Sequence, residues 1–386
     1  MTSEHLQGFA TRAIHAASPA NPVTGAVIPS IDLSVTFGID APGNPSGGYE
    51  YSRVGNPGRD ALQHQLATLE GASHALTFAT GLAAEDALLR SLLRPGDTVL
   101  LGDDVYGGTY RLLTGVFGRW EINVVTVDTS DLGAVERAVA EHSPSVIWLE
   151  TPSNPLMTIT DIAGVANLSG DAVVVVDGTF ATPYLQRPLS LGADVVVHST
   201  TKYLGGHSDV MGGVVATNHD HIAEAVAEHQ SAAGAVLSPF ESWLTMRGIK
   251  TLALRMEKHC DNAEAIAQAL DADPRVKRVY FPGLSDHPGR EIAQAQMVRM
   301  GGMLSFELAS AEQAHAFVTA TTLFTLAGSL GSVDSLVNHP ATMTHAALEG
   351  TPNEISSALI RLSVGIEDVE DLLADLDQAL GAASSQ

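Results

Sequence analysis

The stretch Val195-Val-Val-His-Ser-Thr-Thr-Lys-Tyr-Leu-Gly-Gly-His-Ser-Asp209 decides the fold and directs attention to one lysine. Its β-branched residues predict a buried strand over 195–198, and the hydroxyl and glycine residues that follow predict a loop at the end of that strand. Lys202 would then lie at a sheet edge, where Ser199 and Thr201 can bind a phosphate and the glycines allow a ligand to approach closely. An amine in this position can be desolvated, which lowers its pKa and favours Schiff-base chemistry.

A second strand pattern lies upstream and ends in a carboxylate. The run Ala172-Val-Val-Val-Val176 is followed directly by Asp177. A strand that ends in Asp, followed by a strand that ends in Ser-x-Thr-Lys, is the arrangement that a pyridoxal 5'-phosphate (PLP) site needs, because the carboxylate keeps the pyridine nitrogen protonated and the ring can then accept electrons. From spacing alone, a solvated loop lysine at Lys202 and an ordinary turn aspartate remain alternatives.

The composition indicates a globular protein and excludes several classes. The chain has 386 residues, of which 45% are hydrophobic and 17% charged, enough for two domains. A formal net charge of −24 argues against binding to nucleic acid or to an anionic membrane surface. The single cysteine, Cys260, rules out an internal disulfide and fits a reducing compartment. No apolar run approaches the roughly 18 residues of a membrane span and no signal pattern begins the chain, so we expect a cytoplasmic location.

Helix and strand patterns alternate along most of the chain, which predicts an α/β fold with a mostly parallel sheet covered on both faces. We assign residues 1–58 to an extended N-terminal arm, 59–245 to a large domain and 246–386 to a smaller C-terminal domain. The expected elements of the large domain are strands at 98–101, 124–127, 146–149, 173–176 and 195–198 and helices at 60–69 and 81–93. Further along we expect a long helix at 239–270 with a break near Gly248, strands at 276–281 and 303–307, helices at 311–318 and 367–380, and a frayed tail at 381–386.

Several segments, in a fixed order, together resemble the PLP-dependent enzymes of Cys/Met metabolism, a family that includes cystathionine γ-synthase, cystathionine γ-lyase and methionine γ-lyase. The resemblance extends from about Phe9 to about Leu380 and implies the PLP-dependent transferase-like fold type I, in which a large domain with a sheet of the seven-stranded type adjoins a small α+β domain. Any one segment alone would be weak evidence. The segments are Tyr49-Glu-Tyr-Ser-Arg-Val-Gly-Asn-Pro57, Asp104-Val-Tyr-Gly-Gly-Thr-Tyr-Arg111, Glu150-Thr-Pro-Ser-Asn-Pro155, Ser199-Thr-Thr-Lys-Tyr203, Gly206-His-Ser-Asp209, His339-Pro-Ala-Thr-Met-Thr-His345 and Arg361-Leu-Ser-Val-Gly-Ile-Glu367.

The resemblance implies a role for each cofactor-site residue. Lys202 would form the Schiff base and carry protons between the substrate α and γ carbons, Asp177 would pair with the pyridine nitrogen, and Tyr106 would stack on the ring and act as an acid or base. The helix that begins after Thr80 would bind the phosphate through its free N–H groups. The other expected cofactor contacts are Gly81, Leu82, Asn154, Ser199 and Thr201.

The resemblance also implies how the substrate is held. Arg361 would bind the α-carboxylate with both guanidinium nitrogens, a geometry that lysine cannot reproduce. Ser329 and Asn154 would assist, and Glu50 and Arg111 resemble residues of the cystathionine-handling branch of the family.

The N-terminal arm carries the remaining cofactor contacts. Tyr51 and Arg53 resemble a pair that reaches the phosphate in the neighbouring subunit, which implies a homodimer with shared sites and, as is usual in the family, a tetramer built as a dimer of active dimers. The two histidines of the segment 339–345 match no strong metal-binding spacing, and no metal is expected.

The reaction expected from this resemblance is γ-elimination from a small L-amino acid, nearest to that of cystathionine γ-lyase. Three positions depart from the family pattern: Gly178 stands where asparagine is usual, Gly328 where glutamate is common, and Ser332 where glycine is common. Without the glutamate, a charge partner for the distal amine of cystathionine is missing. Two alternatives therefore stay open: γ-replacement on an O-acylhomoserine, as in cystathionine γ-synthase, and loss of chloride from 4-chloroallylglycine to form propargylglycine, for which the family has a precedent. A non-enzymatic sensor of the same fold is disfavoured, since the chain leaves no room for a DNA-binding domain.

Overall fold

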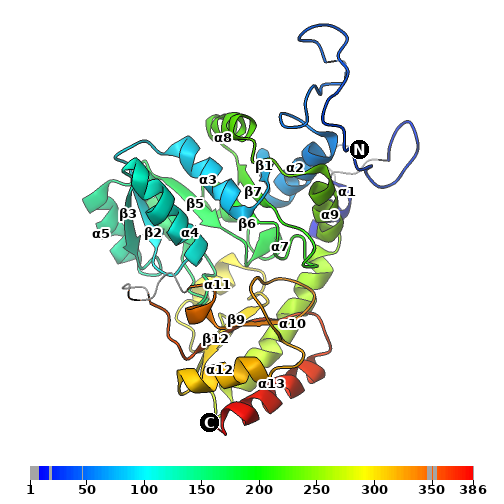
Figure 1. The fold of residues 1–386 in the computed structure, drawn as a ribbon. Coiled ribbons are helices and arrows are strands. Elements are labelled where there is room, and N and C mark those ends of the chain that lie inside the picture. Colours follow the sequence, from blue (N-terminus) through cyan, green and yellow to red (C-terminus); the bar gives the residue numbers. More distant parts are fainter. Residues whose placement is uncertain (1–7, 17–19, 46, 346–349, 351–353, 386) are drawn as a thin grey trace.

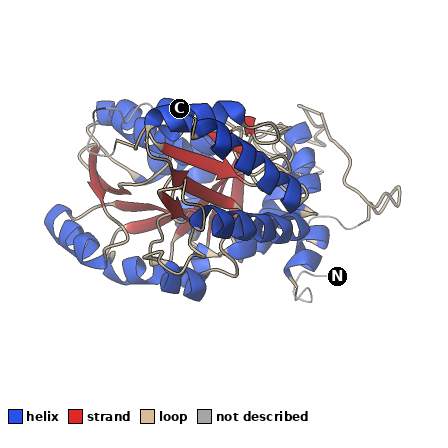
Figure 2. Cartoon of the chain, turned by 90° about the horizontal axis from the view of Figure 1, so that it is seen from below, coloured by secondary structure: helices blue, strands red, loops and turns tan. Residues whose placement is uncertain are grey.

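The computed structural model describes residues 8–16, 20–45, 47–345, 350 and 354–385. Two sheets dominate this part of the chain, and Figure 1 shows them as an upper and a lower layered unit joined by the long helix α10 (Leu252–Asp271). The upper unit has helices on both faces of its sheet, as the second view also shows (Figure 2). The fold is the α/β arrangement expected from the sequence.

The larger sheet contains seven strands in the order β1-β7-β6-β5-β4-β2-β3. Strands β2 to β6 run parallel, whereas β7 is antiparallel to both of its neighbours, β1 and β6. The central strands are apolar on both faces because helices cover both, which is why their sequences read as continuous valine-rich runs. The strands are β1 (His74–Phe78), β2 (Thr98–Gly102), β3 (Asn123–Val127), β4 (Val146–Glu150), β5 (Val173–Asp177), β6 (Val195–Ser199) and β7 (Gly213–Thr217).

The helices around this sheet begin with side-chain caps at several positions. Asn56 accepts hydrogen bonds from two backbone N–H groups at the start of α2, and Thr80 accepts one at the start of α3. The helices of this unit are α2 (Pro57–Glu70), α3 (Gly81–Leu92), α4 (Gly107–Arg111), α5 (Leu132–His142), α6 (Ile162–Leu168), α7 (Thr182–Leu185), α8 (Asp220–Ala233) and α9 (Pro239–Ile249), with short π or 3₁₀ turns at Leu112–Val116, Phe117–Trp120 and Pro188–Leu191.

The smaller sheet contains five strands in the order β10-β11-β12-β9-β8 and is antiparallel except where β10 pairs with β11. Two helices pack against each other on one side of it, α12 and the closing amphipathic helix α13 (Figure 1). The elements are β8 (Arg278–Tyr280), α11 (Arg290–Gln296), β9 (Met303–Glu307), α12 (Ala311–Ala320), β10 (Thr325–Leu326), β11 (Leu336–Asn338), a 3₁₀ turn at Pro340–Thr342, β12 (Leu359–Ser363) and α13 (Val369–Ala383).

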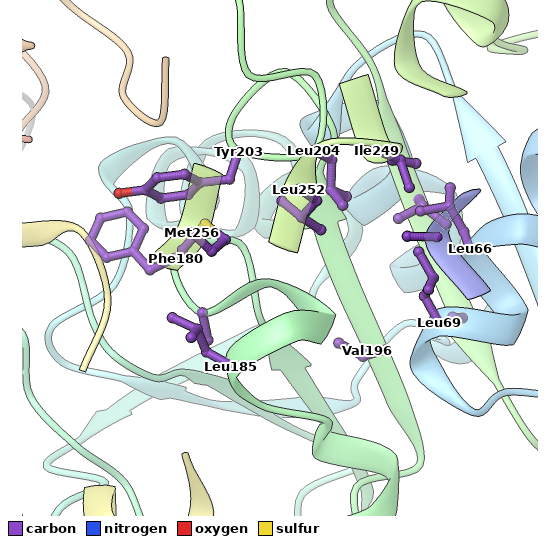
Figure 3. Close-up of a cluster of buried hydrophobic side chains, with 14 of the residues drawn as sticks. Leu66, Leu69, Phe180, Leu185, Val196, Tyr203, Leu204, Ile249, Leu252 and Met256 are labelled. Atoms are coloured by element: carbon purple, nitrogen blue, oxygen red, sulfur yellow. The ribbon is translucent and has the colours of Figure 1, made fainter. Parts of the chain in front are cut away.

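A buried apolar cluster joins α2, α7, α9 and α10 to the larger sheet, and Figure 3 shows Leu66 and Leu69 on one side of it and Tyr203, Phe180 and Met256 on the other. Its members are almost completely buried, including Tyr203 directly after Lys202. Burying a side chain of this size contributes about 1.5–3 kcal/mol. The packing of Tyr203 therefore holds the loop that carries Lys202 in place.

The N-terminal segment differs in part from the extended arm expected for residues 1–58. Helix α1 (Phe9–His15) packs against α2 and α10. Only the chain between about residue 20 and the start of α2 projects from the body (Figures 1 and 2). This projecting part is rich in exposed apolar side chains, namely Val23, Val27, Ile28, Leu33, Val35 and Val54. The boundary expected at 58 lies one residue inside α2, and the other boundary, at 245, lies inside α9. The domain limits themselves stay a prediction.

Other expectations about the elements were incomplete. The strands β1, β7, β10, β11 and β12 were not predicted. The helix expected at 239–270 is two helices, α9 and α10, and the break lies at Lys250 and Thr251, near Gly248 as expected. The tail expected to fray from residue 381 continues α13 as far as Ala383, because that residue packs into the small-domain core with only 2% of its surface exposed.

Candidate active site

One cavity of about 280 Å³ brings together most of the predicted site residues. It lies at the carboxyl ends of β4, β5 and β6, where ligands bind in open α/β sheets, and residues of the smaller sheet close its other side. Of the residues predicted from the sequence, the cavity wall contains Gly81, Leu82, Tyr106, Asn154, Asp177, Ser199, Thr201, Lys202, Ser329 and Arg361.

Lys202 lies in this cavity with its amine partly removed from water. Its Nζ donates a hydrogen bond to Oγ of Ser329 at 2.8 Å. Burial, with a smaller contribution from the positive charge of Arg361, lowers the pKa of Lys202 to about 8. A substantial fraction of the amine is therefore neutral near physiological pH, as a nucleophile or a proton acceptor must be.

Asp177 ends β5 and is almost completely buried. Its Oδ1 accepts a hydrogen bond from the backbone N–H of Thr179 at 2.9 Å, which supplies the orienting contact that Gly178 cannot make. Burial raises the pKa of Asp177, while that hydrogen bond and the charges of His198 and Lys202 oppose the rise. A Cβ added to Gly178 would lie 2.7 Å from Cε1 of His198, so this imidazole fills the place where another side chain would begin.

The N-terminus of α3 approaches β6 so closely that a side chain at residue 81 would crowd Ser199. A Cβ on Gly81 would lie 3.0 Å from Cβ of Ser199. The hydroxyl of Thr80 caps the N–H of Ala83, which leaves the N–H groups of Gly81 and Leu82 without intrahelical partners. Together with the Ser199 hydroxyl, they form the kind of site that binds a phosphate.

Arg361 and Asn154 are in direct contact on the opposite wall. Arg361 lies within β12 and is 2% exposed; its Nη1 donates to Oδ1 of Asn154 and its Nη2 to the carbonyl of Ser329, both at 2.9 Å. Burial lowers the pKa of Arg361 to about 10, so the guanidinium stays positive at neutral pH. His345 donates from Nε2 to the carbonyl of Asn154 at 3.0 Å, which fixes the loop after β4.

Tyr106 precedes α4 and lines the cavity. Its backbone N–H donates to Oε2 of Glu150 at 2.7 Å. Burial raises the pKa of the Tyr106 phenol, so the hydroxyl carries its proton at neutral pH. This hydroxyl is therefore available as a proton donor facing the cavity.

Four predicted residues lie outside the cavity wall of the single chain. Glu50 and Tyr51 are exposed on the projecting segment, and Arg53 donates a hydrogen bond to the carbonyl of Ser231. Arg111 is exposed at the end of α4. The arm residues are the ones expected to act on a neighbouring subunit, and their role there stays a prediction.

The sequence reasoning missed several residues of the cavity wall. Glu85 and Glu150 are buried carboxyls. The helical periodicity of α3 places Glu85 on an otherwise apolar helix face, and this pattern could have identified it from the sequence. The remaining missed residues are Thr179, Phe180, Met211, Leu330 and Thr344.

The positions that depart from the family pattern lie at different distances from the site. Gly328 directly precedes the cavity residue Ser329, and a Cβ added to Gly328 would meet nothing within 4 Å. Ser332 is buried instead, and its hydroxyl donates to Asp334 at 3.1 Å. Gly328 is therefore the departure with open space beside the site.

Known proteins with similar sequences and structures agree with the cofactor expected for this site. The family described as "Cys/Met metabolism PLP-dependent enzyme" matches residues 10–381. The chain belongs to this family. It is 52% identical to a cystathionine gamma-synthase of Mycobacterium tuberculosis over 97% of both chains, and 48% identical to a cystathionine beta-lyase of Lactococcus lactis over 97% of this chain and 99% of the relative. The crystal structure of cystathionine gamma synthase from Xanthomonas oryzae in complex with aminoacrylate and cysteine is 43% identical, covers 98% of this chain and 99% of its own, and superposes with a TM-score of 0.95.

Membership makes this protein a PLP-dependent enzyme of amino-acid metabolism with fold type I, as predicted. The residues of the cavity fit the cofactor: an amine with a lowered pKa, a buried carboxylate and a helix N-terminus surround one space. In the part of the chain that the structure describes, no helix is long and apolar enough to cross a membrane.

Proposed function

We propose that this enzyme catalyses γ-elimination from a small L-amino acid that carries a leaving group on Cγ. The observation that carries the proposal is the pairing of a partly neutral Lys202 with a buried Arg361 across one cavity. An amine that can move protons and a guanidinium that can hold a carboxylate are the two groups that such a reaction requires of the protein.

Bound PLP would supply an electron sink that stabilises negative charge developing at the substrate carbons. Lys202 would bind the cofactor covalently, Asp177 would hold the ring nitrogen, and Asn154 would contact the ring hydroxyl. The N-terminus of α3, with Ser199 and Thr201, would bind the phosphate. Tyr106 would lie against the ring.

Lys202 would then act as the proton carrier. Its pKa of about 8 lets the amine accept a proton from Cα and return it to Cγ with little cost at neutral pH. The hydrogen bond to Ser329 gives Nζ a fixed position from which both carbons can be reached. The protonated Tyr106 hydroxyl would donate toward the departing group.

Arg361 would orient the substrate through its α-carboxylate. Its Nε is buried without a hydrogen-bond partner, and its two other nitrogens contact only neutral oxygens. A carboxylate would supply the missing negative partner, so substrate binding would remove the cost of the unpaired buried charge.

Gly328 favours a substrate without a distal ammonium group. Glycine at position 328 offers no carboxylate that could pair with such a group, and a Cβ there would meet nothing within 4 Å. This supports 4-chloroallylglycine, which would lose chloride, over cystathionine, which would lose a thiol. The identity to the M. tuberculosis synthase supports a third candidate, γ-replacement on an O-acylhomoserine.

The functional unit that we propose is a dimer with shared sites, and two such dimers would form a tetramer. The exposed Tyr51 and Arg53 lie on a segment whose apolar side chains have no cover within the described chain. A second subunit would cover them and receive the arginine at its phosphate site. We also propose that the enzyme is located in the cytoplasm.

The test is a parallel assay of the purified enzyme with cystathionine, O-succinylhomoserine, O-acetylhomoserine, methionine and 4-chloroallylglycine, each with and without cysteine. We expect a keto acid, ammonia and the released leaving group from the saturated substrates, or propargylglycine and chloride without ammonia from 4-chloroallylglycine, in each case without need for cysteine. Product formation that requires cysteine and yields cystathionine would replace γ-elimination by γ-replacement. No turnover of any compound would reject the proposal.

A further inference from the structure

Glu85 is a buried carboxyl in the cofactor cavity that takes no part in the reaction proposed for the site. It lies in the second turn of α3, is 3% exposed, and lines the same cavity as Asp177 and Lys202. Its Oε2 is buried without a hydrogen-bond partner. The neighbouring residues of α3, including Ala84 and Leu88, are buried and apolar, so packing alone does not require an acid at this position.

The charged groups that act on Glu85 are of the wrong sign to stabilise its carboxylate. Asp177 at the end of β5 and Glu150 at the end of β4 interact unfavourably with it, and the Tyr106 phenol also lies within range. Burial first, and then the charge of Asp177, raises the pKa of Glu85 well above its usual range, and the hydroxyl of Thr109 opposes the rise only in part.

The two cations of the cavity are engaged elsewhere. Lys202 donates to Ser329, and Arg361 donates to Asn154 and Ser329, so the structure shows no ion pair between either of them and Glu85. Within the described residues there is also no group of His, Cys, Asp and Glu arranged to hold a metal ion. A buried acid with an unpartnered oxygen is costly, and a cationic ligand in this cavity would remove that cost.

We propose that Glu85 is a second cofactor-binding carboxyl at the ring-nitrogen end of the site, where it acts with Asp177 to bind the positively charged pyridine ring of PLP. The proposal rests on the assignment of Asp177 made above. Asp177 would hold the protonated ring nitrogen of the cofactor at the end of β5, and Glu85 lines the same cavity and would supply a second negative charge to that cation.

The proposal has a consequence for protons. Without a cation, two neighbouring buried carboxyls hold a proton, as closely spaced acids do. When the cationic ring binds, Glu85 ionises: its O–H bond breaks, the proton passes to solvent, and the carboxylate remains beside the ring. Cofactor binding would therefore release a proton that a neutral residue at position 85 cannot supply.

Isothermal titration of pyridoxal 5'-phosphate into the apoprotein tests this, in buffers of different ionisation enthalpy, with wild type, Glu85→Gln and the control Glu224→Gln. Glu224 is an exposed acid on α8 and undergoes the same chemical change. We expect wild type and the control to release the same number of protons, the Glu85 variant to release fewer, and its affinity to fall about ten-fold, the scale of one charge-assisted contact. Equal proton release and equal affinity in all three proteins would overturn the proposal.

Two further measurements separate the possible failures. Thermal unfolding of the apoproteins against pH shows whether the variant folds; because the pKa of Glu85 is raised in the folded state, wild type should lose stability relative to Glu85→Gln as the pH rises above the unfolded value. Parallel curves would reject a protonated Glu85. An Asp177→Asn variant tests the assignment beneath the proposal. If it weakens ring binding and Glu85→Gln does not, only the role of Glu85 fails; if it has no effect, the assignment of Asp177 fails as well.

Discussion

Nη1 of Arg361 lies 2.9 Å from Oδ1 of Asn154, although 207 residues separate them in the chain. Arg361 comes from β12 of the smaller sheet, and Asn154 from the loop after β4 of the larger one. One hydrogen bond thus connects the residue that we expect to hold the substrate carboxylate with the residue that we expect to contact the cofactor ring. The position of each would then depend on the other.

This connection predicts the behaviour of Arg361→Lys. A lysine keeps the charge but cannot contact Asn154, Ser329 and a carboxylate together. We expect kcat/KM to fall about ten- to hundred-fold, corresponding to about 1.5–3 kcal/mol for a charge-assisted contact, mainly through KM. Steady-state kinetics on the best substrate checks this. An unchanged KM would mean that another group binds the carboxylate.

Borohydride reduction of the PLP-loaded protein should attach the cofactor irreversibly to Lys202. The expectation follows from its place in the cavity and its lowered pKa. Peptide mapping by mass spectrometry identifies the modified residue, and Lys202→Ala should give no adduct. An adduct on Lys250, at the break between α9 and α10, would refute the assignment.

The rate of PLP incorporation into the apoprotein should depend on the protonation of Lys202. Its folded pKa is below the usual value, so the neutral amine becomes available as the pH rises through about 8, and the rate should rise to a plateau above that pH. Arg361→Gln removes a positive charge that contributes to the lowered pKa, which should move the midpoint upward. Arg247→Gln, on an exposed part of α9, is the matched control and should leave it in place. A midpoint that does not respond to Arg361→Gln would contradict this account.

A mixture of Arg53→Ala and Lys202→Ala subunits should recover activity that neither variant has alone. In a shared site, one hybrid interface contains both an intact Lys202 and an intact Arg53. The measurement is activity after unfolding and joint refolding, with subunit exchange verified by native mass spectrometry. If exchange occurs without recovery, Arg53 serves only its own chain, where it contacts Ser231.

Gly328→Glu should improve the use of cystathionine relative to smaller substrates. The added side chain meets nothing within 4 Å at its Cβ, so the overpacking that could mask the effect is absent at that atom. We expect about ten-fold or more in kcat/KM for cystathionine, from one charge-assisted contact of about 1.5–3 kcal/mol. Gly328→Gln controls for size. Efficient turnover of cystathionine by wild type, unimproved by glutamate, would show that the departure at this position does not set specificity.

The sequence was sufficient for the parts of the fold that repeat a strong local pattern. The valine runs that became β5 and β6 are continuous and end in polar residues, so both strands and the positions of Asp177 and Lys202 were predictable. Strand β1 is one of the two edge strands of the larger sheet, and β7 pairs with it antiparallel. Their sequences mix small, polar and apolar residues, because their partners are set by long-range pairing rather than by local periodicity.

The site was predictable where a motif carries a residue and not where packing does. Arg361 and Asn154 were found through their motifs, but their contact was not, because it depends on how the two sheets meet. Glu85 has no motif, and its position in the cavity follows from the rotation of α3 against the larger sheet. Tyr51 is expected to contact the phosphate site of a neighbouring subunit, so its contacts depend on how two chains assemble.

Ser329 has a φ of +76°. Residues other than glycine and asparagine adopt this left-handed backbone conformation at a cost of about 1–2 kcal/mol. In this conformation its carbonyl reaches Arg361 while its hydroxyl reaches Lys202. A glycine there would relieve the strain and lose the hydroxyl. Selection for thermal stability and selection for turnover would therefore favour different residues at this position, and a programme to make the enzyme more heat-resistant should leave Ser329 unchanged.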